Sequence, residues 1–305
     1  MNFLGKKGKG GVGGSQRSAY LFLLPSTVIL IVFVFVPLIS TFFISLLHMD
    51  VFMQNASFVG LANFKQLFAD SRVFGDTVNT LYFTVMEVPL QIVVALLLAT
   101  LIARDTPFNK LMRTVFYLPF ICSLTAIGIV WSMLLDPNMG WLPYVLGKIG
   151  VPSFSLLQDQ NLAMPTIAII SVWKGFGYTI TLLVAAILNV PESLYEAANL
   201  DGAGYWSKFA KITIPEIWPT ICFCIVTNTI GSLQTFDLPY IMTKGGPDYR
   251  TETIVEYIYD RGFQTAPYSL GYASTISVYL FIIIAIVTFV LRRFVLNRQE
   301  EGPAT

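Results

Sequence analysis

Six long apolar stretches limit what this chain of 305 residues can fold into more than any other feature. Each is long enough for a membrane helix, which needs about 20 mainly apolar residues. They lie at Tyr20–Leu46, Val78–Ile102, Leu111–Leu135, Leu162–Leu188, Glu216–Phe236 and Leu270–Leu296. Charged residues make up only 12% of the chain, against about 25% in soluble domains. The sequence therefore predicts an all-α polytopic membrane protein with six transmembrane helices.

The first stretch follows a basic segment, as a signal peptide would. It is much longer than the 7 to 15 apolar residues of a signal core and lacks a small-x-small cleavage site, so we expect it to stay in the mature protein. The predicted division is a flexible basic tail over 1–18, a transmembrane domain over 19–298 and a C-terminal tail over 299–305.

The orientation follows from the Lys and Arg residues of alternate loops. The side that holds both termini carries twelve of them, and the opposite side carries six. This asymmetry predicts that both termini are cytoplasmic. The outer loops, at 47–77, 136–161 and 237–269, are too short to hold a catalytic domain.

The chain offers little for catalysis or metal binding. It has one histidine, His48, and its three cysteines, Cys122, Cys222 and Cys224, all lie in apolar stretches, where thiols behave as small hydrophobes. We therefore expect no metal site and no catalytic residues. An intramembrane enzyme would need paired acids or a nucleophile with its base, and the isolated Glu87 does not supply them. The net charge of +1 gives no sign of nucleic-acid binding.

A glycine-rich segment near the N-terminus imitates a phosphate-binding loop. Residues 8–15 satisfy G-x-G-x-x-G, but the lysine that a phosphate loop needs before its Ser or Thr is replaced by Gly14. No strand precedes the segment. We interpret it as part of the flexible basic tail, close to anionic lipid headgroups.

The loop between the fourth and fifth stretches, at about 189–215, contains a short predicted helix. Pro191 suits the first turn of this helix, and Glu192 and Glu196 lie towards its positive N-terminal end. Gly202 can end the helix. Small residues such as Ala198 leave the backbone nearly bare, which suits insertion into a cleft of another protein. Taken alone, this helix could equally be a solvated connector.

The same loop resembles the EAA loop of ABC importer permeases. That pattern reads E-A-A, three residues, G, nine residues, I-x-L-P, and this chain departs from it only at Ile214, which replaces the leucine. The matching positions include Glu196, Ala197, Ala198, Asp201, Gly202, Ile212 and Pro215. The resemblance implies the type I ABC importer permease fold, with this helix as a cytoplasmic coupling helix.

Further matches resemble the first of the two paired permeases of maltose and glycerol-phosphate uptake systems. They lie at 79–84, 173–178, 236–237 and 243–247. The resemblance implies a bacterial cytoplasmic membrane location, a sugar or sugar-like solute and an external solute-binding protein. It also implies a second, related permease and two ATPase subunits, which bind ATP and Mg, so this chain needs no cofactor of its own. Glu196, Ala197, Ala198, Asp201 and Gly202 would contact the ATPase. A stand-alone secondary transporter would not explain the EAA loop, whereas an importer of polyamines or anionic sugars would.

Two polar stripes mark a candidate solute pathway, because polar groups at membrane depth are costly unless they face protein or water. The fifth stretch places Asn228, Gly231, Ser232 and Thr235 on one helical face, and the fourth does the same for Lys174, Gly177, Tyr178 and Thr181. Gly175 lies in the segment 173–178 that carries part of the resemblance. Hydroxyls and amides suit sugar hydroxyls, and Tyr178 or Trp173 can stack on the apolar face of a sugar. The alternative is that these residues join helix to helix.

Lys174 is the only Lys or Arg deep in a predicted span. It can pair with Glu87 of the second span, or it can face the cavity and meet a phosphate or uronate group. His48 lies where the first span leaves the membrane, which favours an interfacial role.

Overall fold

The computed structural model describes residues 15–52, 56–149 and 155–300. Of the predicted tails, 1–14 and 301–305 lie outside these ranges. The described chain is mainly helical, and its only strands form a two-stranded antiparallel ladder of β1 (Leu47–His48) and β2 (Ser57–Phe58). The predicted all-α membrane architecture is confirmed.

The described chain has four helical spans that are long and apolar enough to cross a membrane, or up to six if each of two bent pairs counts as one span. The four are Tyr20–Ile44, Ser71–Ile102, Ala163–Leu188 and Leu270–Arg293. The bent pairs are Pro107–Ile121 with Leu124–Leu134, and Tyr205–Glu216 with Trp218–Leu233. All six predicted stretches therefore correspond to a span or a bent pair.

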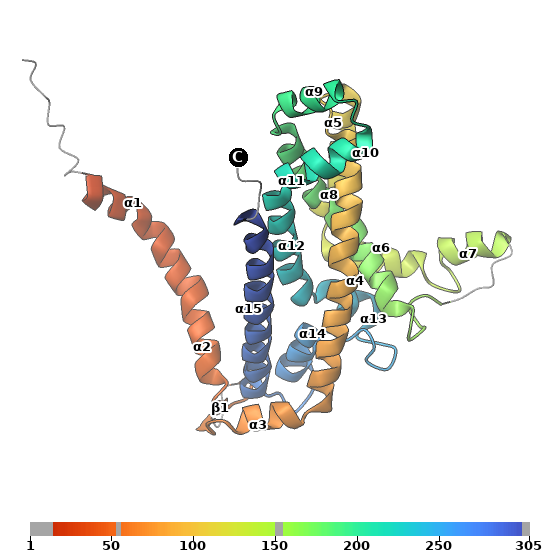
Figure 1. Cartoon of the computed structure of the whole chain (residues 1–305). Coiled ribbons are helices and arrows are strands. Elements are labelled where there is room, and N and C mark those ends of the chain that lie inside the picture. Colours follow the sequence, from red (N-terminus) through yellow and green to blue (C-terminus); the bar gives the residue numbers. More distant parts are fainter. Residues whose placement is uncertain (1–14, 53–55, 150–154, 301–305) are drawn as a thin grey trace, which may run out of the picture.

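The first span runs through α1 (Ser15–Leu30), the π-helical turn η2 (Ile31–Phe35) and α2 (Val36–Ile44), and it diverges from the other helices (Figure 1). Its most apolar window has no buried residue. It approaches the bundle near α2, where the rings of Phe42 and Phe281 lie edge to face at 5.8 Å. The first span thus leaves nearly its whole apolar surface for lipid or another protein.

The bundle core consists of α4 (Ser71–Ile102), α8 (Ala163–Leu188) and α12 (Trp218–Leu233), with α5 (Pro107–Ile121) against α8. Ala95 and Ala99 of α4 are fully buried, as are Ile180 and Leu183 of α8. Small residues let the backbones of membrane helices approach closely. The long α15 (Leu270–Glu300) packs beside α12 and α2.

The predicted third span is broken. The chain bends by 92° between α5 and α6 (Leu124–Leu134). Cys122 and Ser123 at the break have extended backbone conformations, with ψ of 147° and 132°. Pro119, inside the last turn of α5, removes one helix-stabilising N–H donor. The predicted span over Leu111–Leu135 therefore consists of two helices joined by a sharp bend, which hydropathy does not detect.

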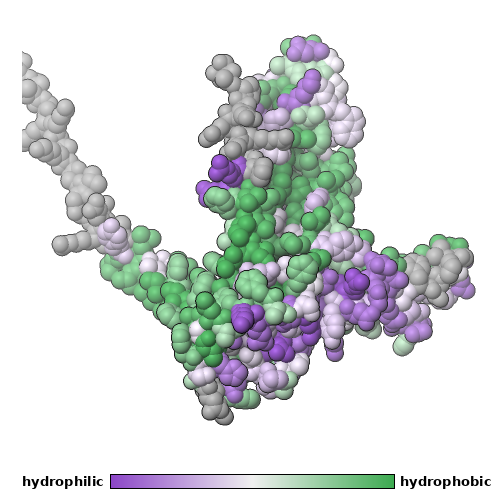
Figure 2. Space-filling view, turned by 60° about the horizontal axis from the view of Figure 1, so that its bottom comes forward, coloured by the Kyte–Doolittle hydropathy of each residue, from purple (hydrophilic) through white to green (hydrophobic). Residues whose placement is uncertain are grey.

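Short helices occupy the remaining loops. Towards the end with α15's first turn they are α3 (Ala62–Ala69), α13 (Asp237–Thr243), α14 (Ile254–Tyr259) and the π-helical η4 (Asp260–Gln264), whereas α7 (Trp141–Lys148) projects from the side of the bundle (Figure 1). At the opposite end lie α9 (Glu192–Leu200), α10 (Tyr205–Lys208), the π-helical η3 (Phe209–Thr213) and α11 (Ile214–Glu216). Hydrophilic residues gather at the end of the bundle that carries α3 and α14, whereas hydrophobic residues cover its middle (Figure 2).

Candidate functional site

A polar cavity of about 300 Å³ lies among α4, α8 and α12, beside the α5–α6 break and the start of α13. Its lining includes seven residues that the sequence proposed for the solute pathway: Lys174, Gly175, Tyr178, Asn228, Gly231, Ser232 and Thr235. Gly177 and Thr181, which share the stripe on α8, are not part of the lining. Two polar stripes from separate helices therefore face one space.

Hydrogen bonds also join the lining residues across helices. The amide Nδ2 of Asn228 donates to Oγ1 of Thr179 at 3.3 Å, and Nε2 of Gln91 donates to the same oxygen at 3.1 Å. Ser232 Oγ donates to Oγ1 of Thr84 at 3.2 Å. Asn228 and Ser232 therefore combine both features that the sequence offered as alternatives. They line the cavity, and they also hydrogen-bond to neighbouring helices.

Lys174 faces the cavity without an ion pair to Glu87. Its Nζ donates to the carbonyl oxygen of Phe120 at 3.2 Å and lies 4.9 Å from the centre of the Phe120 ring. Glu87 instead accepts a hydrogen bond from Ser171 Oγ at 2.7 Å. The predicted Lys174–Glu87 pair is therefore absent among the ion pairs of the described residues.

Aromatic rings form one wall of the cavity. Tyr178 stacks on Phe120 with ring centres 5.1 Å apart, and both line the space. Trp173, the other ring considered for sugar stacking, packs edge-on against Trp131 and is not part of the lining. Of the two predicted stacking residues, only Tyr178 lies in position to meet a solute here.

The glycines of the two stripes differ in their surroundings. A side chain at Gly231 would meet open space. At Gly175 it would meet Oε1 of Gln91 at 2.8 Å, so the missing side chain gives the Gln91 amide room. At Gly177 it would collide with the carbonyl oxygen of Phe116 on α5. Gly177 is therefore a packing residue, because the α5–α8 contact needs its bare backbone.

Several lining residues escaped the sequence analysis. Gln91 lies one turn after Glu87 on α4, and this spacing of four residues places both on one face. Helical spacing from Glu87 could therefore have predicted Gln91 as a lining residue. Asp237, at the first position of α13, lies beyond the end of the predicted fifth span. No periodicity could assign it to the cavity.

The predicted coupling helix is present as α9, at the end of the bundle away from α3 and α14 (Figure 1). The N–H of Ala203 donates to the carbonyl of Ala198 at 2.9 Å, and that of Gly202 donates to Asn199 at 3.0 Å. This pair of bonds is the Schellman ending of a helix, which requires a left-handed residue. Gly202 supplies it with φ +71°, as the sequence predicted.

The outer surface of α9 is open. Glu196, Ala197, Asp201 and Gly202 are exposed and Ala198 is half-buried. Leu200 is 91% exposed, which is unusual for a leucine next to a well-formed helix end. On the inner side, Tyr195 and Thr213 hydroxyls hydrogen-bond at 2.9 Å, and Lys208 Nζ donates to Asn199 Oδ1 at 2.5 Å. The helix is thus fastened to η3 and α10 while its other face remains available.

The described residues include no group of three or more His, Cys, Asp or Glu side chains that could hold a metal ion. Cys122, Cys222 and Cys224 are free thiols.

A second cavity, of about 540 Å³, lies between α9, α10 and the end of α4.

Comparisons with known proteins agree with this architecture. A model of the binding-protein-dependent transport system inner membrane component family matches residues 60–299. The chain is 32% identical to the probable ABC transporter permease protein YurN of Bacillus subtilis, with 92% of this chain and 97% of that protein covered. It is 33% identical to the sn-glycerol-3-phosphate transport system permease protein UgpA of Agrobacterium fabrum, over 93% of this chain and 96% of that one. It is 34% identical to the lactose transport system permease protein LacF of Rhizobium radiobacter, over 89% and 92%.

Two solved structures have the same fold. One chain comes from a bacterial ABC transporter that imports the acidic polysaccharide alginate, with a TM-score of 0.79, 24% identity and coverage of 92% of this chain and 96% of that chain. Another comes from the alginate ABC transporter in complex with a periplasmic protein bound to alginate pentasaccharide, with a TM-score of 0.76, 26% identity and 92% coverage of both chains. On this evidence, together with its apolar spans and EAA loop, the chain belongs to the family of binding-protein-dependent transport system inner membrane components and is an ABC transporter permease.

Proposed function

We propose that this chain translocates a sugar or sugar-like solute through the cavity among α4, α8 and α12. The observation that carries the proposal is the convergence of Asn228, Ser232, Thr235 and Gln91 with the ring of Tyr178 on one space. Amides and hydroxyls are both donors and acceptors, as sugar hydroxyls are. The volume of about 300 Å³ lies at the lower end of the range of about 300–1,000 Å³ for small-molecule sites.

The names of the relatives support a solute of this class. They include permeases for sn-glycerol 3-phosphate and for lactose, and an importer of alginate. The solute would be an oligosaccharide, a monosaccharide or a glycerol-phosphate-like molecule. An external solute-binding protein would deliver it, and the permease would open to each side in turn.

We further propose that α9 couples the spans to ATP hydrolysis on partner subunits. The residues that would contact a groove of the ATPase subunit are Glu196, Ala197, Ala198, Asp201 and Gly202. ATP and Mg would bind elsewhere on that subunit. Carboxylates at 196 and 201 can pair with basic groups of that partner. The permease would then have no catalytic site and no cofactor of its own. The end with α9 would be cytoplasmic, together with both termini.

A second candidate is an importer of anionic solutes, and Lys174 favours it. Its ammonium group lines the cavity, donates to the Phe120 carbonyl at 3.2 Å and makes no ion pair among the described residues. A phosphate or uronate could take that place. Glu87 and Asp237 also line the cavity, so a polyamine importer remains the competing assignment among importers of charged solutes.

Uptake into vesicles that contain the complete transporter tests the main proposal. Asn228→Ala is expected to reduce uptake of the transported sugar about tenfold, by removing a hydrogen-bonding amide from the cavity. The matched control is Thr220→Ala, on the same helix but outside the cavity lining. ATPase activity without solute should be unchanged in both. Normal uptake by Asn228→Ala would contradict a pathway through this cavity.

The same vesicles separate the two candidates when uptake of a neutral sugar is compared with uptake of its uronate. Lys174→Met is expected to abolish uptake of the uronate alone if the solute is anionic. Equal effects on both solutes would show that Lys174 acts by holding the end of α5 through its hydrogen bond to Phe120, and not by binding the anion.

A further inference from the structure

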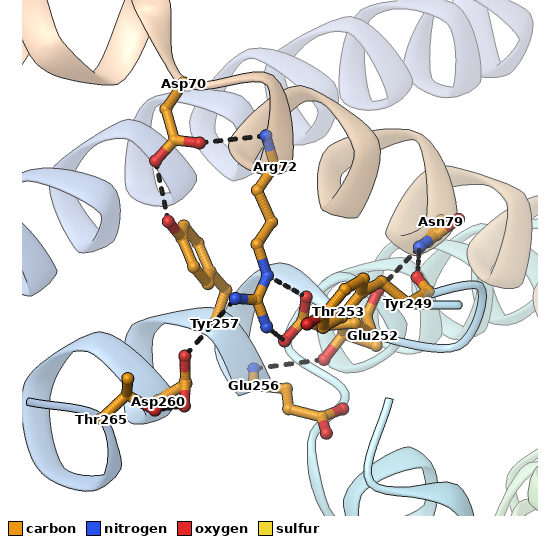
Figure 3. Close-up of polar contacts among 10 residues, drawn as sticks. All are labelled: Asp70, Arg72, Asn79, Tyr249, Glu252, Thr253, Glu256, Tyr257, Asp260 and Thr265. Carbon is orange, nitrogen blue, oxygen red and sulfur yellow. Dashed lines mark hydrogen bonds and ion pairs between the residues drawn. The ribbon is translucent and has the colours of Figure 1, made fainter. Parts of the chain in front are cut away.

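An ion pair at the outer end of the bundle joins two distant parts of the chain (Figure 3). Arg72, in the first turn of α4, donates from Nε to Oε2 of Glu252 at 2.7 Å and from Nη2 to Oε1 at 2.6 Å. A second carboxylate, Asp260, lies 3.7 Å from Nη1. The Glu252 side chain is 4% exposed. Two parallel bonds to a buried carboxylate fix both position and angle, which a single-point cation cannot do.

Two aromatic rings cover part of the guanidinium group of Arg72, whose side chain is 32% exposed. Its carbon lies 4.1 Å from the centre of the Tyr249 ring and 4.8 Å from that of Tyr257. Such rings attract the cation and reduce its contact with water. The bidentate pair is therefore partly shielded, and removing Arg72 would leave the buried carboxylate of Glu252 without its main counter-ion.

This ion pair fastens a loop whose backbone is unusual. Within residues 244–253, three residues other than glycine have left-handed backbones: Lys244 with φ 50°, Asp248 with φ 48° and Tyr249 with φ 57°. Such conformations cost free energy and persist only when the surrounding structure holds them. Residues of α4 hold this loop, because Asn79 Nδ2 donates to the carbonyls of Tyr249 at 2.7 Å and Glu252 at 3.0 Å.

The fastened loop leads directly to the solute cavity. Thr253 follows Glu252, and its hydroxyl donates to the carbonyl oxygen of Thr235 at 2.9 Å. Thr235 lines the cavity, and so do Phe236 and Asp237, which lead into the helix before the loop. The segment 235–237 is thus connected to Arg72 by one ion pair, one peptide unit and one hydrogen bond.

From these contacts we propose that Arg72 is a positioning residue for the solute pathway: through Glu252 and Thr253 it fixes the outer wall of the cavity at 235–237. The inference rests on the proposed function for the cavity's role in transport, but the geometry it asserts can be measured without a solute. Arg72 touches neither the cavity nor the ATPase-facing helix, so its effect reaches the pathway only through the loop.

The test uses a thiol at the wall of the cavity. Thr235→Cys is introduced after Cys122, Cys222 and Cys224 have been replaced by Ala, and the assembled transporter is placed in lipid nanodiscs. The rate of reaction with a maleimide then reports how open the wall is. Arg72→Gln is expected to raise this rate at least about tenfold, as removal of one partner of a buried ion pair should. Arg72→Lys keeps the charge but cannot form the two parallel hydrogen bonds to Glu252, so an intermediate labelling rate is expected.

A matched control and a double variant sharpen the result. Lys65→Gln removes an exposed cation from α3, on the same side of the molecule, and should leave the rate unchanged. Glu252→Gln should match Arg72→Gln, and the double variant should be no faster than either single one, because both remove the same interaction. Elution of the intact complex from a sizing column excludes loss of assembly as the cause.

An unchanged labelling rate in Arg72→Gln, or effects of the two single variants that multiply in the double variant, would overturn the inference. Neither result depends on which solute is carried. Conversely, faster labelling together with normal uptake by Asn228→Ala would support the role of Arg72 in positioning the wall and would contradict the proposed pathway.

Discussion

Glu256 illustrates how a single side chain can make the end of this permease that carries α14 sensitive to pH. It lies on α14, close to Glu252 (Figure 3), and is 4% exposed. Its Oε2 has no hydrogen-bond partner among the described residues. Burial and then the charge of Glu252 raise the pKa of Glu256 from 4.5 to about 8. The protonated acid is therefore the form that suits the folded protein.

The stability from this group should be fully present below about pH 4.5 and should be lost as pH rises towards about 8. Over that window the unfolded chain gives up a proton that the folded chain keeps, so the free energy of unfolding falls with pH. The charged groups that face Glu256 include Arg72, Asp76, Glu252 and Asp260.

Glu256→Gln cannot ionise, and we expect it to remove part of this pH dependence. Thermal unfolding of the purified transporter in nanodiscs should give a Tm that falls by several degrees in the wild type between about pH 5 and pH 9, and by less in Glu256→Gln. Glu216→Gln, an exposed acid on α11, is the control. Identical pH profiles for wild type and Glu256→Gln would show that Glu256 is ionised in the folded protein.

At the scale of elements, α9 makes a sharp prediction because the two glycines that follow it differ in the sign of φ. Gly202 has φ +71° and Gly204 has φ −71°, and a side chain at either would meet open space. Gly202→Val must pay for a left-handed backbone, at about 1–2 kcal/mol, whereas Gly204→Val need not. We expect only Gly202→Val to weaken ATPase pull-down and the stimulation of ATPase activity by loaded binding protein.

A larger change on α9 should be more severe. Ala198 is half-buried, so Ala198→Arg is expected to abolish docking of the ATPase while solute binding at the opposite end persists. Wild-type stimulation in both Ala198→Arg and Gly202→Val would identify α9 as a passive connector.

The sequence predicted individual helices better than it predicted the contacts between them. Helical spacing within one stretch assigned Asn228, Ser232 and Thr235 to one face, and a fixed motif assigned α9 and its glycine end. Neither signal carries information about pairs of distant residues. Arg72 and Glu252 are 180 residues apart, and their contact depends on how α4 and the loop before α14 are packed. The bend at Cys122 was missed for a related reason, since apolar composition continues on both sides of it.

At the scale of the whole molecule, the first span indicates how the permease assembles. Its most apolar window is entirely unburied, and the span diverges from the bundle (Figure 1). We predict that a second, related permease covers part of this surface, since six spans alone enclose too little for a complete pathway between two ATPases. Purification from native membranes should recover both permeases in equal amounts with two ATPase domains. A transport-competent complex that contains only this permease would contradict the prediction.

The interrupted helices have a consequence for how a solute moves. Phe120 and Leu124, on either side of the α5–α6 break, and Gln234, at the end of α12, all line the cavity. Backbone groups at such interruptions lack their usual helical partners, and at membrane depth this is tolerated only where they are buried in protein or line a space filled with water. The proposed pathway would therefore be hydrated. A sugar that entered it would exchange its bulk water for a wall of hydrogen-bonding groups and the water beside them.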